Sequence, residues 1–156
     1  MITSAQCLKR YGNPVLLETQ SKHFELWKVP VNIQTEFKHV NFIAAGTVGF
    51  PTKIFINKEF RPVLEKALLN VIKRGLQKEL KRWDGCFMIR KKVSNESLSL
   101  HSWAIAIDVN RDENDYGKKP KLSQAFVDCF IDAGCDWGGA WNPKDGMHFQ
   151  LAKFPT

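Results

Sequence analysis

The sequence predicts an α+β fold in which helices pack on a mainly antiparallel sheet. Three observations favour this class: short segments in which apolar and polar residues alternate, two longer segments with helical periodicity, and no regular strand–helix–strand repeat. The chain has 156 residues, enough for one domain with a substantial hydrophobic core. We therefore expect a single domain over residues 1–156.

The strands are predicted from two-residue alternation and the helices from apolar residues spaced three and four apart. A helix is expected from Asn57 to Gly75, because Asn57 is a suitable N-cap and Gly75 follows the last apolar residue. Pro62 is compatible with this helix because it falls in the first turn. A second helix is expected over 123–133. Strands are expected at 24–29, 53–56, 86–90, 103–109 and 147–151.

The segment 103–109 has two different faces. Its large side chains lie on one face, whereas Ala104, Ala106 and Asp108 share the other. We expect the large face to pack on the core. The carboxylate of Asp108 should then point into the open space above the two alanines. This face of the strand could therefore line a functional site.

Composition and charge narrow the classes of function. No apolar run approaches the roughly 18–20 residues of a membrane span. The first residues lack a basic segment followed by an apolar one, so we expect no signal peptide and synthesis into the cytoplasm. The net charge, 23 − 16 = +7, favours an anionic partner such as nucleic acid, a membrane surface or the acidic polymers of a cell wall.

The four cysteines do not form a recognisable metal or redox motif. They stand at positions 7, 86, 129 and 135, so no two are spaced as Cys-x-x-Cys. A cysteine zinc ribbon and a thioredoxin-like motif are therefore disfavoured. We expect all four thiols to be reduced.

Two imidazoles and a carboxylate in the last third of the chain make a candidate metal site. His101, Asp108 and His148 offer the nitrogen and oxygen ligands that zinc binds, and three protein ligands leave one position open for catalysis. Asp145, three residues before His148, is then free to act as a general base. These spacings are loose, so the alternative stays open that the four are ordinary polar residues at strand ends and turns.

Chelation by both His101 and Asp108 imposes a geometric requirement. Seven residues of straight strand span about 23 Å, too far for two ligands of one ion. His101 should therefore lie in a turn just before the strand.

The segment from Gly85 to Phe149 resembles the family of D-Ala-D-Ala carboxypeptidases and phage L-alanyl-D-glutamate peptidases, the VanY-type zinc metallopeptidases. The family pattern is Ser-x-His-x6-Asp, followed by an acidic residue-x2-His. It stands here as Ser99-Leu100-His101, Asp108 and Asp145-Gly146-Met147-His148. Arg90 matches an upstream arginine of the family, and the loop 137–141 is similar to its phage and prophage members.

This resemblance implies a role for each matched residue. His101, Asp108 and His148 would be zinc ligands and Asp145 the catalytic base. Arg90 and Ser99 would contact the substrate, although the hydroxyl of Ser99 is equally suited to a local turn bond. The resemblance also implies a hedgehog-like fold with its core at about 53–156, preceded by an extension, 1–50, of unclear role. The family usually has glycine where Ala104 stands, and a positive φ there would strain alanine.

The function expected from the resemblance is zinc-dependent cleavage of peptidoglycan stem peptides, by a phage or prophage endolysin with L-alanyl-D-glutamate endopeptidase activity. A D-Ala-D-Ala carboxypeptidase or dipeptidase is the alternative, followed by a non-catalytic cell-wall binding module of the same fold. A nucleic-acid-binding domain is not expected, because none of its signatures is present. We expect a monomer that waits in the host cytoplasm and acts at the wall after release.

Overall fold

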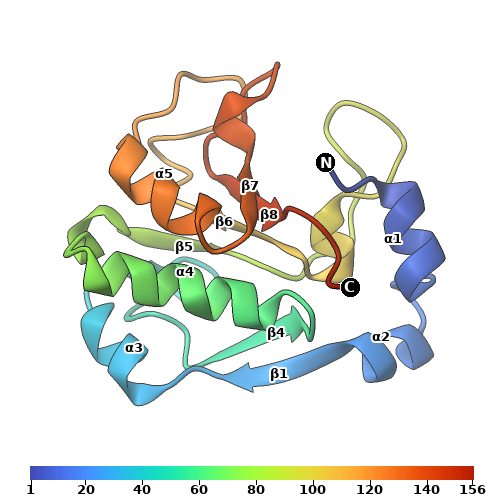
Figure 1. Cartoon of the computed structure of the whole chain (residues 1–156), viewed down its shortest axis with the longest axis horizontal. Coiled ribbons are helices and arrows are strands. Elements are labelled where there is room, and N and C mark those ends of the chain that lie inside the picture. Colours follow the sequence, from blue (N-terminus) through green and yellow to red (C-terminus); the bar gives the residue numbers. More distant parts are fainter.

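The computed structural model describes residues 1–156 as two β-sheets and five α-helices (Figure 1). The helices are α1 (Ser4–Tyr11), α2 (Leu17–His23), α3 (Val31–Glu36), α4 (Arg61–Lys73) and α5 (Gln124–Ile131). Short 3₁₀ turns occur at η1 (Gln77–Glu79), η2 (Leu100–Trp103) and η3 (Gly138–Ala140). None of the helices combines the length and the apolar character that a membrane span requires.

The strands form one pair and one larger sheet. They are β1 (Phe24–Lys28), β2 (Asn41–Phe42), β3 (Thr47–Val48), β4 (Lys53–Asn57), β5 (Arg82–Gly85), β6 (Ala106–Val109), β7 (Cys135–Trp137) and β8 (His148–Leu151). β1 pairs with β4, and the other six have the order β3-β2-β5-β6-β8-β7. In the view of Figure 1, α4 crosses the middle of the molecule, with α5 above it and the β1–β4 pair below.

The α+β class is confirmed, but the six-stranded sheet is mixed, which corrects the expectation of a mainly antiparallel sheet. β2 runs parallel to β5, whereas the other neighbouring strands of this sheet are antiparallel. A parallel pair needs a crossover connection, and the chain between β2 and β5 contains α4. This pairing was not predicted because β2 belongs to the N-terminal region, where the sequence pattern is weak.

One hydrophobic cluster of 35 buried residues contains side chains from the whole chain, including residues 1–50. In α4, Leu64, Ala67, Leu68 and Val71 supply the buried face at the spacing that predicted the helix. Ile33 and Phe37 are among the N-terminal residues in the same cluster. The single domain over 1–156 stays a prediction, which this continuous core supports.

The N-terminal region also supports the loops that precede the candidate site. The indole Nε1 of Trp103 donates a hydrogen bond of 2.8 Å to the carbonyl oxygen of Gly12. The hydroxyl of Ser4 donates one of 2.6 Å to the carbonyl oxygen of Leu98. Residues 1–50 therefore complete the core and hold the segment 98–103 in place.

Three of the predicted boundaries were wrong. Asn57 does not cap α4 but ends β4, where its buried side chain accepts from the backbone N–H of Glu59 and donates to the carbonyl of Trp103. The strand expected at 86–90 lies earlier, as β5, and ends in a bulge at Gly85, whose φ is +126°. The carbonyl of Cys86 is then free to turn toward a histidine side chain instead of a strand.

The strand predicted from Trp103 begins three residues later, at Ala106. Trp103 lies in η2, and Ala104 has left-handed backbone angles of φ 55° and ψ 35°. Ala104 thus has the positive φ at which alanine, unlike glycine, is strained. Ala104 is fully buried, so its methyl group also contributes to packing.

We predict that Ala104→Gly changes the free energy of unfolding by less than about 1 kcal/mol. Relief of left-handed strain, about 1–2 kcal/mol, is offset by the loss of a buried methyl, about 0.8 kcal/mol, and by added freedom of the unfolded chain, about 0.4–1 kcal/mol. Ala104→Val should destabilise by at least about 2 kcal/mol, because a β-branched residue is strained at positive φ and overpacks the site. Urea denaturation of the two variants measures the difference, and equal stability would contradict it.

Candidate metal centre

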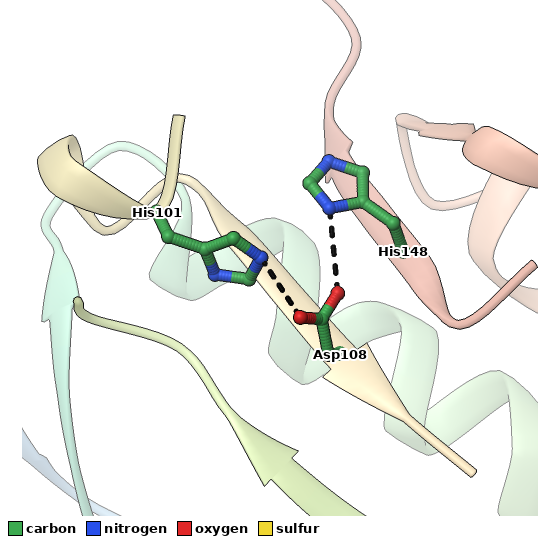
Figure 2. Close-up of side chains that lie close together, drawn as sticks. All are labelled: His101, Asp108 and His148. Carbon is green, nitrogen blue, oxygen red and sulfur yellow. Dashed lines mark ion pairs between the residues drawn. The ribbon is translucent and has the colours of Figure 1, made fainter. Parts of the chain in front are cut away.

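Three side chains with metal-binding atoms converge at the end of β6 (Figure 2). Asp108 on β6 is paired directly with His148 on β8, so both side chains rise from the same face of the sheet as near neighbours. His101 reaches them from η2. Their ligand atoms all lie within 4.8 Å of one another.

His101 reaches the others because the chain folds back between it and the strand, as the chelation argument required. The left-handed Ala104 redirects the chain from η2 into the strand. The end of β4 fixes this turn: the backbone N–H of Asn57 donates to the carbonyl of Ala104 at 3.1 Å. The turn is thus tied to a second sheet as well as to its own strand.

The distances between the three side chains fit a tetrahedral ion. His101 Nε2 lies 3.2 Å from Asp108 Oδ2, and His148 Nδ1 lies 3.4 Å from Asp108 Oδ1. Two ligands that each lie about 2.0–2.1 Å from one tetrahedral zinc are roughly 3.3 Å apart. Each imidazole nitrogen therefore already lies at about this spacing from one oxygen of the Asp108 carboxylate.

Each histidine has an outer partner that orients its ring. His101 Nδ1 donates to the carbonyl oxygen of Cys86 at 2.7 Å, which leaves Nε2 with a free lone pair. His148 Nε2 donates to Gln150 Oε1 at 2.9 Å, which leaves Nδ1 directed at Asp108. In the neutral tautomers, both rings thus direct their unprotonated nitrogen at the carboxylate of Asp108.

Several polar atoms at this point are buried and without a hydrogen-bond partner. They include His101 Nε2, Asp108 Oδ1 and Asp145 Oδ1. His101 Nε2 and Asp108 are close, but they are not aligned as a hydrogen bond. Unpaired buried polar groups are costly, and a cation between them would satisfy several at once.

The pKa values of Asp108 and His148 are shifted by burial and by the close pairing of the two side chains. Burial opposes ionisation of Asp108, yet the two adjacent imidazoles, His101 foremost, lower the pKa of Asp108 well below its usual range. Burial also favours neutral His148, but the Asp108 carboxylate raises the pKa of His148. A metal bound here would replace a proton on His148 as the partner of Asp108.

Asp145 lies beside the three-residue group without belonging to it. Its Oδ2 is 3.9 Å from His148 Nδ1, and burial raises the pKa of Asp145. Its backbone N–H donates to the carbonyl of Gly138 at 2.9 Å. A Cβ at Gly138 would overlap the carbonyl oxygen of Asp145, so the glycine is needed for this close approach.

All six residues predicted for the site line one cavity of about 520 Å³. The side chain of Arg90 is half-buried there, and it forms no ion pair within the chain. Ser99 caps η2, and its hydroxyl accepts from the N–H of His101 at 3.4 Å. The local turn bond anticipated for Ser99 is therefore present, although Ser99 also lines the cavity.

Gln150 and the carbonyl of Cys86 were not predicted as parts of the site. Gln150 is 3% exposed, lines the cavity and has an amide Nε2 without a partner. A signal for Gln150 was available, because it follows His148 by two residues and so shares its face of the strand. No pattern in the sequence marks a backbone carbonyl such as that of Cys86.

Comparison with known proteins supports one family. A family model described as D-alanyl-D-alanine carboxypeptidase matches residues 92–151. This segment contains His101, Asp108, Asp145 and His148, whereas Arg90 lies just outside it. No curated protein and no solved structure matches the chain. Over these residues the chain is similar to that family of peptidases, and the buried His101–Asp108–His148 group is consistent with metal binding.

Proposed function

We propose that the chain is a zinc-dependent peptidase that cleaves peptidoglycan stem peptides, and that it is an endolysin with L-alanyl-D-glutamate endopeptidase activity. One observation carries the proposal: three chelating side chains, a carboxylate of raised pKa and an unpaired arginine line the same cavity. The net charge of +7 supports action at an anionic wall after release from the host cytoplasm.

In this proposal His101 Nε2, Asp108 and His148 Nδ1 hold the zinc. A set of two neutral imidazoles and one carboxylate leaves the ion with net positive charge. When bound, the zinc supplies Lewis-acid polarisation of the scissile carbonyl and lowers the pKa of a coordinated water. The Cys86 carbonyl and Gln150 keep the two rings in the tautomers that this binding requires.

Asp145 is proposed to move the protons. Its carboxylate is buried beside the chelating group, and Oδ1 has no partner within the chain. A raised pKa makes Asp145 a better proton acceptor than an ordinary aspartate. Asp145 would take a proton from the attacking water and return it to the leaving amine.

Arg90 is proposed to hold a substrate carboxylate. A guanidinium forms two parallel hydrogen bonds to a carboxylate, and no acidic residue of the chain forms an ion pair with Arg90. Ser99 is the weaker of the two proposed contacts, because its hydroxyl already accepts from the backbone of His101.

Two alternatives remain. The description of the matching family favours a D-Ala-D-Ala carboxypeptidase or dipeptidase, which would use the same metal and base. A non-catalytic binding module would have no need for a buried carboxylate of raised pKa such as Asp145.

We predict that the purified protein solubilises peptidoglycan, that chelation stops it and that added zinc restores it. Mass spectrometry of the released fragments identifies the bond: new L-alanine C-termini and D-glutamate N-termini indicate the endopeptidase, whereas free D-alanine indicates the carboxypeptidase. Full activity of a metal-free preparation would rule out the mechanism.

We predict that Asp145→Asn and His148→Ala both lose peptidase activity, but for different reasons. Asp145→Asn should retain zinc and lose about 10²–10⁴-fold in turnover, the usual contribution of a general acid–base group. His148→Ala should lose the metal, which inductively coupled plasma mass spectrometry measures directly. Equal metal loss in both variants would place Asp145 among the ligands instead.

We predict that Gln150→Leu weakens zinc affinity by about 10–100-fold, the usual effect of removing an outer hydrogen bond to a metal ligand. Gln150→Glu should retain affinity, because its carboxylate accepts the same bond from His148 Nε2. Chelator competition measures the affinities, with the melting temperature of the metal-free variants as the control for folding. Unchanged zinc affinity in Gln150→Leu would contradict the orienting role.

A further inference from the structure

The segment Arg90–Lys92 presents two basic side chains to the cavity. Lys91 bridges to Leu98, and hydrogen bonds of 2.8 Å from Lys92 N to Ser97 O and from Ser99 N to Arg90 O continue this pairing. The segment is therefore extended, with alternate side chains on opposite sides. Arg90 and Lys92 accordingly both line the cavity, whereas Lys91 does not and pairs with Glu96.

Neither cavity-facing cation is neutralised by the chain. Arg90 forms its hydrogen bonds through backbone atoms, with Ser102 and Ser99. Lys92 has neither an ion pair nor a side-chain hydrogen bond, although it is half-buried like Arg90. The acidic residue of this loop, Glu96, forms an ion pair with Lys91 and not with either of the two cations that line the cavity.

The two cations have different surroundings in the cavity. Arg90 lines the cavity together with His101, Asp108 and Asp145, and its backbone N–H donates to the hydroxyl of Ser102, the residue after His101. Burial raises the pKa of the Cys7 thiol to about 12, and the charge of Lys92 opposes that rise. Cys7 belongs to α1, so the surroundings of Lys92 include the N-terminal helix.

We propose that Arg90 and Lys92 form a paired anion subsite that selects peptides bearing two carboxylates roughly 7 Å apart, the spacing of alternate residues in an extended chain. The choice of a peptide as the substrate class rests on the proposed peptidase function. The selection for two carboxylates rests on the two unpaired cations that line the cavity. Two unpaired cations in a partly desolvated cavity repel each other. A dianionic ligand removes that repulsion and gains a charge-assisted hydrogen bond at each end.

A binding experiment tests the subsite separately from catalysis. The probe is acetyl-L-alanyl-γ-D-glutamyl-L-lysine, which has one carboxylate on D-glutamate and one at its C-terminus, together with two analogues that each have one of these amidated. Binding is measured by calorimetry on the zinc-loaded full chain with Asp145→Asn, so that the peptide is not cut. Lys92→Met is compared with Lys91→Met, the matched control whose partner lies outside the cavity.

Each amidation should weaken binding by about tenfold in the background protein and in Lys91→Met, as expected for one lost bond to a charged group. In Lys92→Met, one of the two amidations should have no further effect while the other keeps its full effect. Three results would overturn the subsite. These are a weakening of about tenfold by both amidations in Lys92→Met, the loss of one amidation's effect in Lys91→Met as in Lys92→Met, and no binding of the parent peptide. Two-carboxylate selectivity without cleavage by the Asp145-containing protein would overturn the proposed function alone.

Discussion

The carboxylate of Asp108, buried between two imidazoles, is the interaction on which the rest of the site depends. A buried charge is tolerated only when neighbouring groups compensate it, and here His101 and His148 do so from different parts of the chain. The register of β6 and β8 is therefore constrained. A slip of one residue would turn His148 to the opposite face of the sheet and leave Asp108 without one of its partners.

The backbone turn before β6 follows from the same constraint. His101 must approach Asp108 within a few residues of sequence, and a straight strand does not allow that approach. A 3₁₀ turn and one left-handed residue solve the problem, at some conformational cost because that residue is Ala104 and not glycine. Asn57 donates hydrogen bonds to the carbonyls of Trp103 and Ala104, and the indole of Trp103 donates to the carbonyl of Gly12. Residues far from the site in sequence therefore stabilise the turn.

Burial of polar groups connects the structural and chemical roles of the site. The adjacent imidazoles lower the pKa of Asp108 despite its burial, whereas burial raises the pKa of Asp145, which lies just outside the group. Two carboxylates within one cavity thus acquire different properties: one suits a metal and the other suits a proton.

Much of the site could be predicted from the sequence, because its constraints are local. The alternation after Trp103 gave Asp108 an inward face, and the reach of an extended chain required a turn at His101. Alternation does not specify the neighbouring strand, so neither the parallel pairing of β2 with β5 nor the role of Gln150 was predicted. The strand expected at 86–90 was also wrong: Met88 and Ile89 are exposed although they are apolar, and the Cys86 carbonyl accepts a hydrogen bond from His101 instead of from a neighbouring strand.

The most direct test of the central claim is a crystal structure of the zinc-loaded protein with anomalous data collected at the zinc edge. We predict one anomalous peak bonded to His101 Nε2, to an oxygen of Asp108 and to His148 Nδ1, with Asp145 nearby but unbound. A structure in which the two histidines still pair directly with Asp108, and in which zinc is absent or bound elsewhere, would contradict the account.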